Sequence, residues 1–127
     1  MARILVVDDS ATQILTVTRM LKKHGHDTVT ASNGEQGIEL ARQELPDLIL
    51  MDVVMPKLNG FQATRRMTHD GNIGHIPVIL MTTKDQQTDK IWGIRQGARD
   101  YIVKPFTEEV LMAAVDKYLP AANAQSR

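Results

Sequence analysis

The chain has 127 residues, of which 43% are hydrophobic, and its 15 basic and 15 acidic residues give a formal net charge of zero. This length suits one domain, and the balanced charge argues against a nucleic-acid binder that works by bulk charge. The absence of cysteine excludes disulfides and thiolate metal sites. No apolar stretch approaches the roughly 20 residues of a membrane span, and the first apolar run starts directly after Arg3, which leaves no room for a signal peptide. We therefore expect a soluble cytoplasmic protein without membrane insertion.

The first half of the chain alternates short apolar runs with helical patterns. Ser10 and Gln13 have the spacing of a capping box, and Gly25 follows the helical pattern that they open. Asn33 precedes a second helical pattern, and Asp52 follows the most apolar run of the chain. The elements expected here are a strand at about 3–8, a helix at about 11–24, a weaker strand at about 27–31, a helix at about 34–44 and a strand ending at 52.

The second half continues the same alternation. A helix is expected to begin at Gly60, Thr83 and Gln86 have the spacing to cap the next helix, Thr107 precedes the last helix, and Pro120 ends it. The expected elements are a helix at about 60–68, a strand ending at 82, a helix at about 85–96, a short strand ending at 103 and a helix after 107. A polar tail follows at 121–127.

This alternation predicts five β–α units without an internal repeat. Right-handed crossovers turn such units into a doubly wound parallel sheet with helices on both faces. For five strands the common order is 2-1-3-4-5, as in flavodoxin-like folds, and the switch point then lies between the first and third strands. We therefore expect an α/β fold with a five-stranded parallel sheet in this order.

Each strong apolar run ends at a polar residue that could take part in chemistry. Parallel strands in an open α/β sheet present their carboxyl ends at one edge, where ligands bind. Residues that follow different strands are therefore expected to converge on one site. These residues are Asp8-Asp9 after the first strand, Asp52 after the third, Thr82-Thr83 after the fourth and Lys104-Pro105 after the fifth.

The chemistry of this residue set favours a phosphoryl group and a hard cation. Three neighbouring carboxylates repel one another unless one is protonated or a cation holds them together. A carboxylate site with open positions suits Mg²⁺, and Lys104 offers a point charge for a phosphoryl oxygen. Asp52 is the best candidate for a nucleophile that forms an aspartyl phosphate, because it lies alone at the end of the most apolar strand, whereas Asp8 and Asp9 lie together as a metal-holding pair would.

One pattern joins these residues to two loop positions, in the order and spacing Asp8-Asp9, Asp52, Pro56, Gly60, Thr82 and Lys104-Pro105. This pattern resembles the receiver domain of two-component response regulators over about residues 2–119. The resemblance implies that Asp52 accepts a phosphoryl group from a histidine kinase. It also implies that Mg²⁺ is held by Asp8, Asp9, Asp52 and the main-chain carbonyl of Val54, and that Lys104 contacts the phosphoryl group.

The resemblance further implies a switch. The Thr82 hydroxyl would turn inward to meet the phosphoryl group, the ring of Tyr101 would follow, and the Lys104-Pro105 peptide bond would be cis. Trp92 and Tyr101 are then expected on a partner face formed by the fourth helix, the fifth strand and the fifth helix. On that fourth helix we expect Ile91 and Ile94 to form the inner stripe.

The chain resembles the stand-alone, CheY-like type, with a receiver domain at 1–120 and a tail at 121–127. Several segments, among them Gly60–Arg65 and Arg95–Tyr101, resemble the receivers of chemotaxis-like systems that control type IV pili and twitching motility. This resemblance implies a CheA-like histidine kinase as partner, a downstream motility protein or the kinase alone as target, and a monomer or weak dimer. It implies no enzyme beyond catalysis of its own phosphorylation and dephosphorylation.

Three other functions remain open from the sequence. A phosphate sink would compete for the same kinase and would need no downstream partner. An Asp-nucleophile, Mg²⁺-dependent phosphatase shares the chemistry, but it typically has Asp-x-Asp, and Val54 stands at the second position here. A flavodoxin-like FMN protein shares the fold, but no Ser/Thr/Gly-rich phosphate loop follows the first strand.

Overall fold

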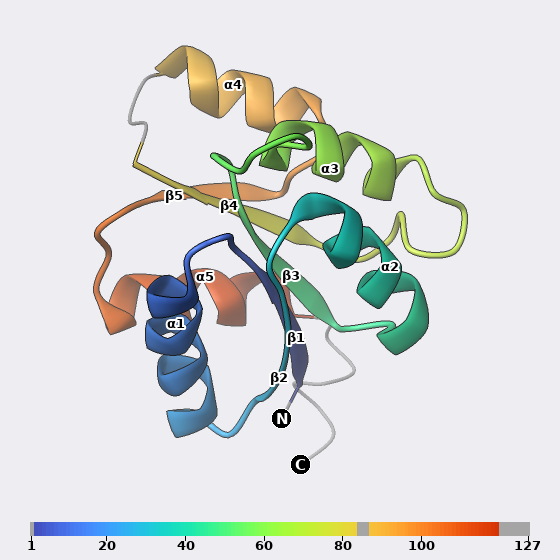
Figure 1. Cartoon of the computed structure of the whole chain (residues 1–127). Coiled ribbons are helices and arrows are strands. Elements are labelled where there is room, and N and C mark those ends of the chain that lie inside the picture. Colours follow the sequence, from blue (N-terminus) through green and yellow to red (C-terminus); the bar gives the residue numbers. More distant parts are fainter. Residues whose placement is uncertain (1, 84–86, 120–127) are drawn as a thin grey trace.

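The computed structural model describes residues 2–83 and 87–119, which form a five-stranded parallel sheet flanked by five helices (Figure 1). The strand order is β2-β1-β3-β4-β5, which confirms the order predicted from the sequence. The elements are β1 Arg3–Val7, α1 Ala11–Lys23, β2 Asp27–Ala31, α2 Gly34–Glu44, β3 Leu48–Asp52, α3 Gly60–Thr68, β4 Val78–Thr82, α4 Gln87–Arg95, β5 Asp100–Val103 and α5 Glu108–Tyr118. The predicted tail, Gln86 and Pro120 lie outside the described residues.

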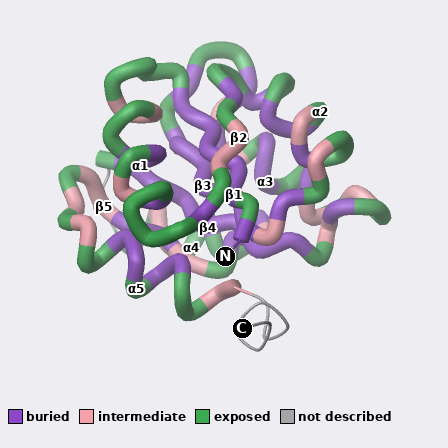
Figure 2. Tube along the Cα trace, turned by 90° about the horizontal axis from the view of Figure 1, so that it is seen from below, coloured by how far each residue is buried: buried purple, intermediate pink, exposed green. Residues whose placement is uncertain are grey.

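The sheet separates two hydrophobic clusters because side chains of each strand alternate between its faces. Leu5 and Val7 of β1 point into the cluster under α2 and α3, whereas Ile4 and Val6 point into the cluster under α1 and α5. Figure 2 shows the buried stretches in the strands at the centre and exposed stretches on the outer sides of the helices. Two covered faces explain why β1, β3 and β4 are almost continuously apolar.

Side-chain caps define the starts of four helices. Ser10 accepts a hydrogen bond from the Gln13 amide, and Thr107 caps α5 as expected from the sequence. At α3 the sequence suggested only that Gly60 begins the helix. The structure adds a complete capping box there: the Asn59 side chain accepts from the Gln62 amide, and the Gln62 side chain accepts from the Asn59 amide.

The orientation of α4 differs from the prediction. Ile91 and Ile94 were expected to face inward, but they are 45% and 50% exposed, and Gly93 is the only buried residue of this helix. The physical reason is that Gly93 occupies the inner face, which brings α4 close to the Leu80 side chain of β4. A Cβ built on Gly93 would lie 2.6 Å from the Cδ1 atom of Leu80.

Two smaller features complete the fold. The Lys104-Pro105 peptide bond is cis, which confirms the prediction. Among the described residues, no helix combines the length and the apolar character needed to cross a bilayer.

Candidate functional site

The sheet register brings the predicted site residues to one edge. Val7 of β1 pairs with Met51 of β3, so Asp8, which directly follows β1, comes beside Asp52, the last residue of β3. At the other side of β3, Thr82 is the last residue of β4 and pairs with Val103. The residue after Val103 is Lys104, whose amide donates to the Thr82 carbonyl oxygen at 2.7 Å. Topology alone therefore assembles residues that lie almost a hundred positions apart.

Lys104 connects the two buried carboxylates of this site. Its Nζ atom donates to Asp52 Oδ1 at 2.9 Å and to Asp8 Oδ2 at 3.0 Å. The side chains of Asp8, Asp52 and Lys104 are 1%, 7% and 14% exposed. Buried carboxylates are tolerated only when they are paired and hydrogen-bonded. The ammonium group therefore compensates both carboxylates and fixes the orientation of each.

The pKa values of this group follow from burial and pairing. Burial is the main reason that the pKa of Asp52 is raised; the hydrogen bond from Lys104 opposes this effect, and the charge of Asp8 adds to it. Burial alone would lower the pKa of Lys104, but its hydrogen bonds to Asp52 and Asp8 and their charges outweigh burial, so the pKa is raised. Lys104 is therefore a firmly protonated cation.

The carboxylates also satisfy the geometry of a cation site. Asp8, Asp9 and Asp52 each offer one ligand atom, and these atoms all lie within 4.8 Å of one another. Oδ1 of Asp8, the oxygen that does not contact Lys104, accepts a hydrogen bond from the Ser10 amide at 2.9 Å, which holds that carboxylate in place. Asp9 is exposed, so the cluster opens to solvent on one side. An all-oxygen set with open positions is the donor set that Mg²⁺ prefers.

The loop between β3 and α3 packs tightly against the end of β3. A Cβ on Gly60 would lie 2.2 Å from the carbonyl oxygen of Asp52, so no other residue fits there. The Gly60 amide donates to the Val53 carbonyl oxygen at 2.8 Å, and the Val53 amide donates to Met81 at 3.0 Å. This contact fixes the backbone around Asp52. The sequence showed Gly60 as a helix start and as a position of the receiver pattern, but not its contact with Asp52, because the close approach depends on how the loop folds back.

The remaining predicted residues lie on three different elements and in the loop after Asp52. Thr82 is fully buried at the end of β4, and Tyr101 of β5 is 9% exposed. Trp92 is 51% exposed on α4, and Val54, in the loop after Asp52, is 55% exposed. Of the two residues predicted for a partner face, Trp92 therefore presents surface here, whereas the ring of Tyr101 is turned inward.

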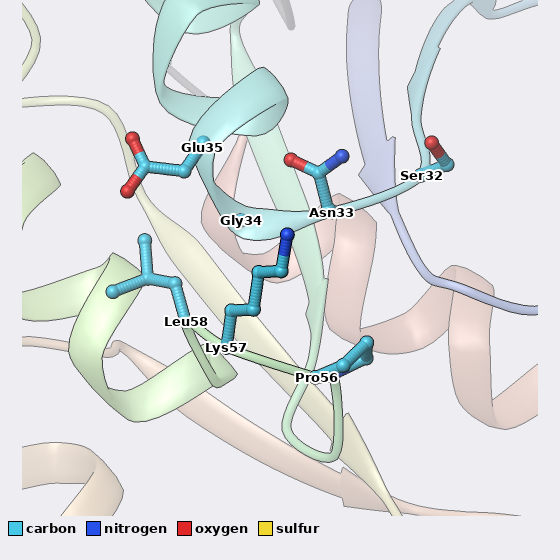
Figure 3. A pocket seen from close by; sticks show the side chains of 7 residues that line it. All are labelled: Ser32, Asn33, Gly34, Glu35, Pro56, Lys57 and Leu58. Carbon is cyan, nitrogen blue, oxygen red and sulfur yellow. The ribbon is translucent and has the colours of Figure 1, made fainter.

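A separate cavity of about 400 Å³ lies between the loop after β2 and the loop after β3 (Figure 3). None of the predicted site residues lines it, and the Lys57 side chain points across it toward Asn33. The residues that line this cavity are Ser32, Asn33, Gly34, Glu35, Pro56, Lys57 and Leu58. The cavity is therefore separate from the acidic site, which consists of Asp8, Asp9, Asp52 and Lys104.

Comparison with known proteins identifies the class. The pattern of the response regulator receiver domain matches residues 4–116. The chain therefore belongs to the response regulator receiver family. Over 94% of its length it is 60% identical to Protein PilH of Pseudomonas aeruginosa and covers 98% of that protein. It is 37% identical, over 92% of its length, to the alkaline phosphatase synthesis transcriptional regulatory protein PhoP of Bacillus subtilis, of which it covers 48%.

Solved structures give the same class. The chemotaxis protein CheY4 of Vibrio cholerae matches with a TM-score of 0.89 and 30% identity over 94% of this chain and 99% of that one. The receiver domain of the sensor histidine kinase PA1611 of Pseudomonas aeruginosa matches with a TM-score of 0.85 and 29% identity, over 92% of this chain and 96% of its own. That structure holds a magnesium ion coordinated in its active-site cleft. The family resemblance and the CheY-like fold inferred from the sequence are confirmed.

Proposed function

We propose that this protein is a phosphorylation-activated response regulator whose phosphoacceptor is Asp52. One observation carries the proposal: a single ammonium group, that of Lys104, hydrogen-bonds both Asp52 and Asp8 beside a cluster of three carboxylates. Such a site offers a nucleophilic oxygen, a fixed cation for a phosphoryl oxygen and ligands for a divalent cation. Residues 1–120 are proposed as the receiver domain and 121–127 as its tail.

The proposed reaction is a phosphoryl transfer from a phosphohistidine of a kinase. A carboxylate oxygen of Asp52 attacks the phosphorus, the new O–P bond forms, and the P–N bond breaks as the imidazole nitrogen leaves with the bonding electrons. Lys104, 2.9 Å from Asp52, is positioned to contact an oxygen of the transferred group. Bound Mg²⁺, held by Asp8, Asp9, Asp52 and the Val54 carbonyl, would neutralise phosphoryl oxygens and favour the charged form of Asp52.

The proposed signal leaves the site through β4 and β5. The Thr82 hydroxyl engages the phosphoryl group, the Tyr101 ring occupies its inward position, and the surface around Trp92 changes its affinity for a partner. The partner-face proposal is supported by three large apolar side chains that are about half exposed on α4, namely Ile91, Trp92 and Ile94. A phosphoryl group can shift this equilibrium only by the difference in its contacts between the two states.

The pathway is proposed from the similarity to PilH. A CheA-like histidine kinase in a type IV pilus, twitching or chemotaxis-like motility system would supply the phosphoryl group in the cytoplasm. The protein would then act as a monomer or weak dimer and signal through protein–protein contact. It would catalyse only its own phosphorylation and dephosphorylation.

Substitution Asp52→Asn tests the proposal directly. In the presence of Mg²⁺ and a small-molecule phosphodonor, we expect the unsubstituted protein to gain one acid-stable, base-labile phosphoryl group and the Asp52→Asn variant to gain none. Intact-protein mass spectrometry measures the added mass. The matched control is Asp116→Asn, which removes an exposed carboxylate on α5 and should label normally. Stoichiometric labelling of Asp52→Asn would refute the assignment.

Two alternatives are separated by further measurements. A phosphate sink removes phosphoryl groups from the kinase without binding a downstream partner. A pull-down should then recover the same proteins with and without beryllofluoride, which mimics the phosphoryl group on Asp52. A messenger should recover an additional partner only with beryllofluoride. Turnover of phosphomonoesters by the purified protein would instead support the phosphatase.

A further inference from the structure

Gly93 is the one buried residue of α4, and little space lies on its inner side. A Cβ built there would lie 2.6 Å from the Cδ1 atom of Leu80, and 3.4 Å from the Cε1 atom of Phe61 and the Cδ2 atom of Tyr101. Contacts below about 3 Å force a displacement, whereas 3.4 Å is already the limit of ordinary packing. The three atoms belong to β4, α3 and β5, so both the sheet and α3 pack against Gly93. A side chain at this position would therefore displace the end of the Leu80 side chain or raise α4 from the sheet.

The ring of Tyr101 is covered by this part of α4. Tyr101 is 9% exposed, although it lies on β5 at the open edge of the sheet, where helix α4 is the adjacent cover (Figure 1). Successive residues of a helix are about 100° apart, so a helix that turns Gly93 toward Tyr101 must turn Trp92 and Ile94 toward its sides and outer surface. The depth of α4 on the sheet and the exposure of Trp92 are thus set by the same residue.

We propose that Gly93 is a positioning residue for the switch: its lack of a side chain sets the height of α4 at which the Tyr101 ring fits in its inward position. The proposal deepens the proposed function, because inward Tyr101 is the state that a phosphoryl group at Asp52 would favour. A larger residue at 93 raises α4, removes the cover of the ring and favours the outward position. Through linkage, it then weakens the affinity of the acidic site for a phosphoryl mimic.

The test compares two glycine-to-alanine substitutions. Gly93→Ala introduces the methyl group at the crowded position, whereas Gly71→Ala introduces it where no atom lies within 4 Å. Both are made together with Tyr118→Phe, so that Tyr101 is the only tyrosine. Nitration of Tyr101 by tetranitromethane is followed by mass spectrometry, and the dissociation constant for beryllofluoride in Mg²⁺ is measured by Trp92 fluorescence. We expect Gly93→Ala to nitrate faster and to bind beryllofluoride more weakly, each by roughly 5-fold or more, and Gly71→Ala to change neither.

A repair variant excludes a general loss of stability. Leu80→Val removes the methyl group that the new Cβ would meet, so Gly93→Ala combined with Leu80→Val should recover protection of Tyr101 and affinity for beryllofluoride. Urea unfolding establishes first that each variant is folded. If Gly93→Ala alone does not fold, the double variant carries the test and must protect Tyr101 as the parent does. Unchanged nitration in Gly93→Ala, an equal effect in Gly71→Ala, or failure of the double variant would each overturn the proposal.

The nitration arm also keeps this proposal separate from the proposed function. Nitration rates without beryllofluoride report only the packing of α4 on Tyr101. If Asp52→Asn still labels but the nitration rates differ as expected, the phosphoacceptor assignment fails and the packing role of Gly93 stands. If labelling depends on Asp52 but nitration is unchanged, the role of Gly93 fails alone.

Discussion

Helices α4 and α5 flank the same edge of the sheet but are held in opposite ways. Helix α5 buries four side chains on one face, Leu111, Met112, Ala114 and Val115, and they pack into the cluster shared with α1. Helix α4 buries only Gly93 and leaves its three largest apolar residues about half exposed. Because hydrophobic stabilisation scales with the apolar area removed from water, α5 is anchored strongly and α4 weakly.

The difference indicates which part of the molecule can move. An element with few buried apolar contacts has a small free-energy difference between alternative positions, so it opens or shifts locally more readily. Helix α4 is also the element that covers Tyr101, at the side of the site where Thr82 ends β4. The molecule thus combines a rigid half around α1 and α5 with an adjustable surface next to its candidate site.

The largest expected effect tests this contrast in stability. Leu111→Ala removes a fully buried side chain of α5 and should lower the free energy of unfolding by about 2–5 kcal/mol. Ile94→Ala removes a half-exposed side chain of α4 and should change it by no more than about 0.5 kcal/mol. Urea unfolding followed by circular dichroism measures both. Equal losses in the two variants would show that α4 is anchored as firmly as α5.

The next prediction concerns the connection between the site and α4. Lys104→Ala removes the cation that hydrogen-bonds Asp8 and Asp52, so beryllofluoride bound at Asp52 should no longer change Trp92 fluorescence. The free energy of unfolding of the variant should also be lower without Mg²⁺ than with it. Two buried carboxylates lose their cationic partner, and a bound divalent cation would compensate their charge. Fluorescence titration and urea unfolding with and without Mg²⁺ measure these effects.

The control for Lys104→Ala is Lys22→Ala, which removes an exposed ammonium group at the end of α1. It should keep both the fluorescence response and the stability of the parent. A normal Trp92 response in Lys104→Ala would show that α4 is coupled to the site without Lys104 and would refute the proposed role of this residue.

The same contrast explains what the sequence could predict. The packing of α1 and α5, the anchored half, was predictable. Their buried residues repeat at helical spacing, a pattern that is visible without knowledge of the neighbouring elements: Val17, Leu21, Leu111 and Val115. The convergence of the strand ends was predictable from topology alone, although the distances from Lys104 to the carboxylates needed coordinates. The orientation of α4 was predicted wrongly.

The error at α4 has a local cause. Ile91 and Ile94 have the spacing of an inner face, and hydrophobic periodicity assigns such residues to the core. What decides the orientation is the close approach of Gly93 to Leu80, a residue of β4 that lies thirteen positions earlier in the chain. A glycine in a helix carries no periodic signal, so its packing role becomes visible only when the neighbouring elements are in place.

The smallest expected effect concerns the anchored half and its response to acid. His26 is 8% exposed at the junction of α1 and β2, and its Nδ1 atom accepts a hydrogen bond from the Ala2 amide at 3.2 Å. Burial lowers the pKa of His26 below the ordinary value of 6.5, and the neighbouring N-terminal charge acts in the same direction. The folded protein therefore favours the neutral form of this ring. Helix α4 contains no histidine, so this response to acid belongs to the anchored half.

The sign of the pH dependence follows from proton binding. Below pH 6.5 the unfolded chain protonates His26 while the folded chain does not, so the free energy of unfolding decreases as the pH falls through this value. The decrease stops below the lowered pKa, where both states bind the proton. Urea unfolding at about pH 7.5 and about pH 5.5 should show a smaller loss of stability in His26→Gln than in the parent. His75→Gln, at an exposed position, should behave as the parent does, and an equal loss in all three proteins would mean that the junction of α1 and β2 does not sense acid.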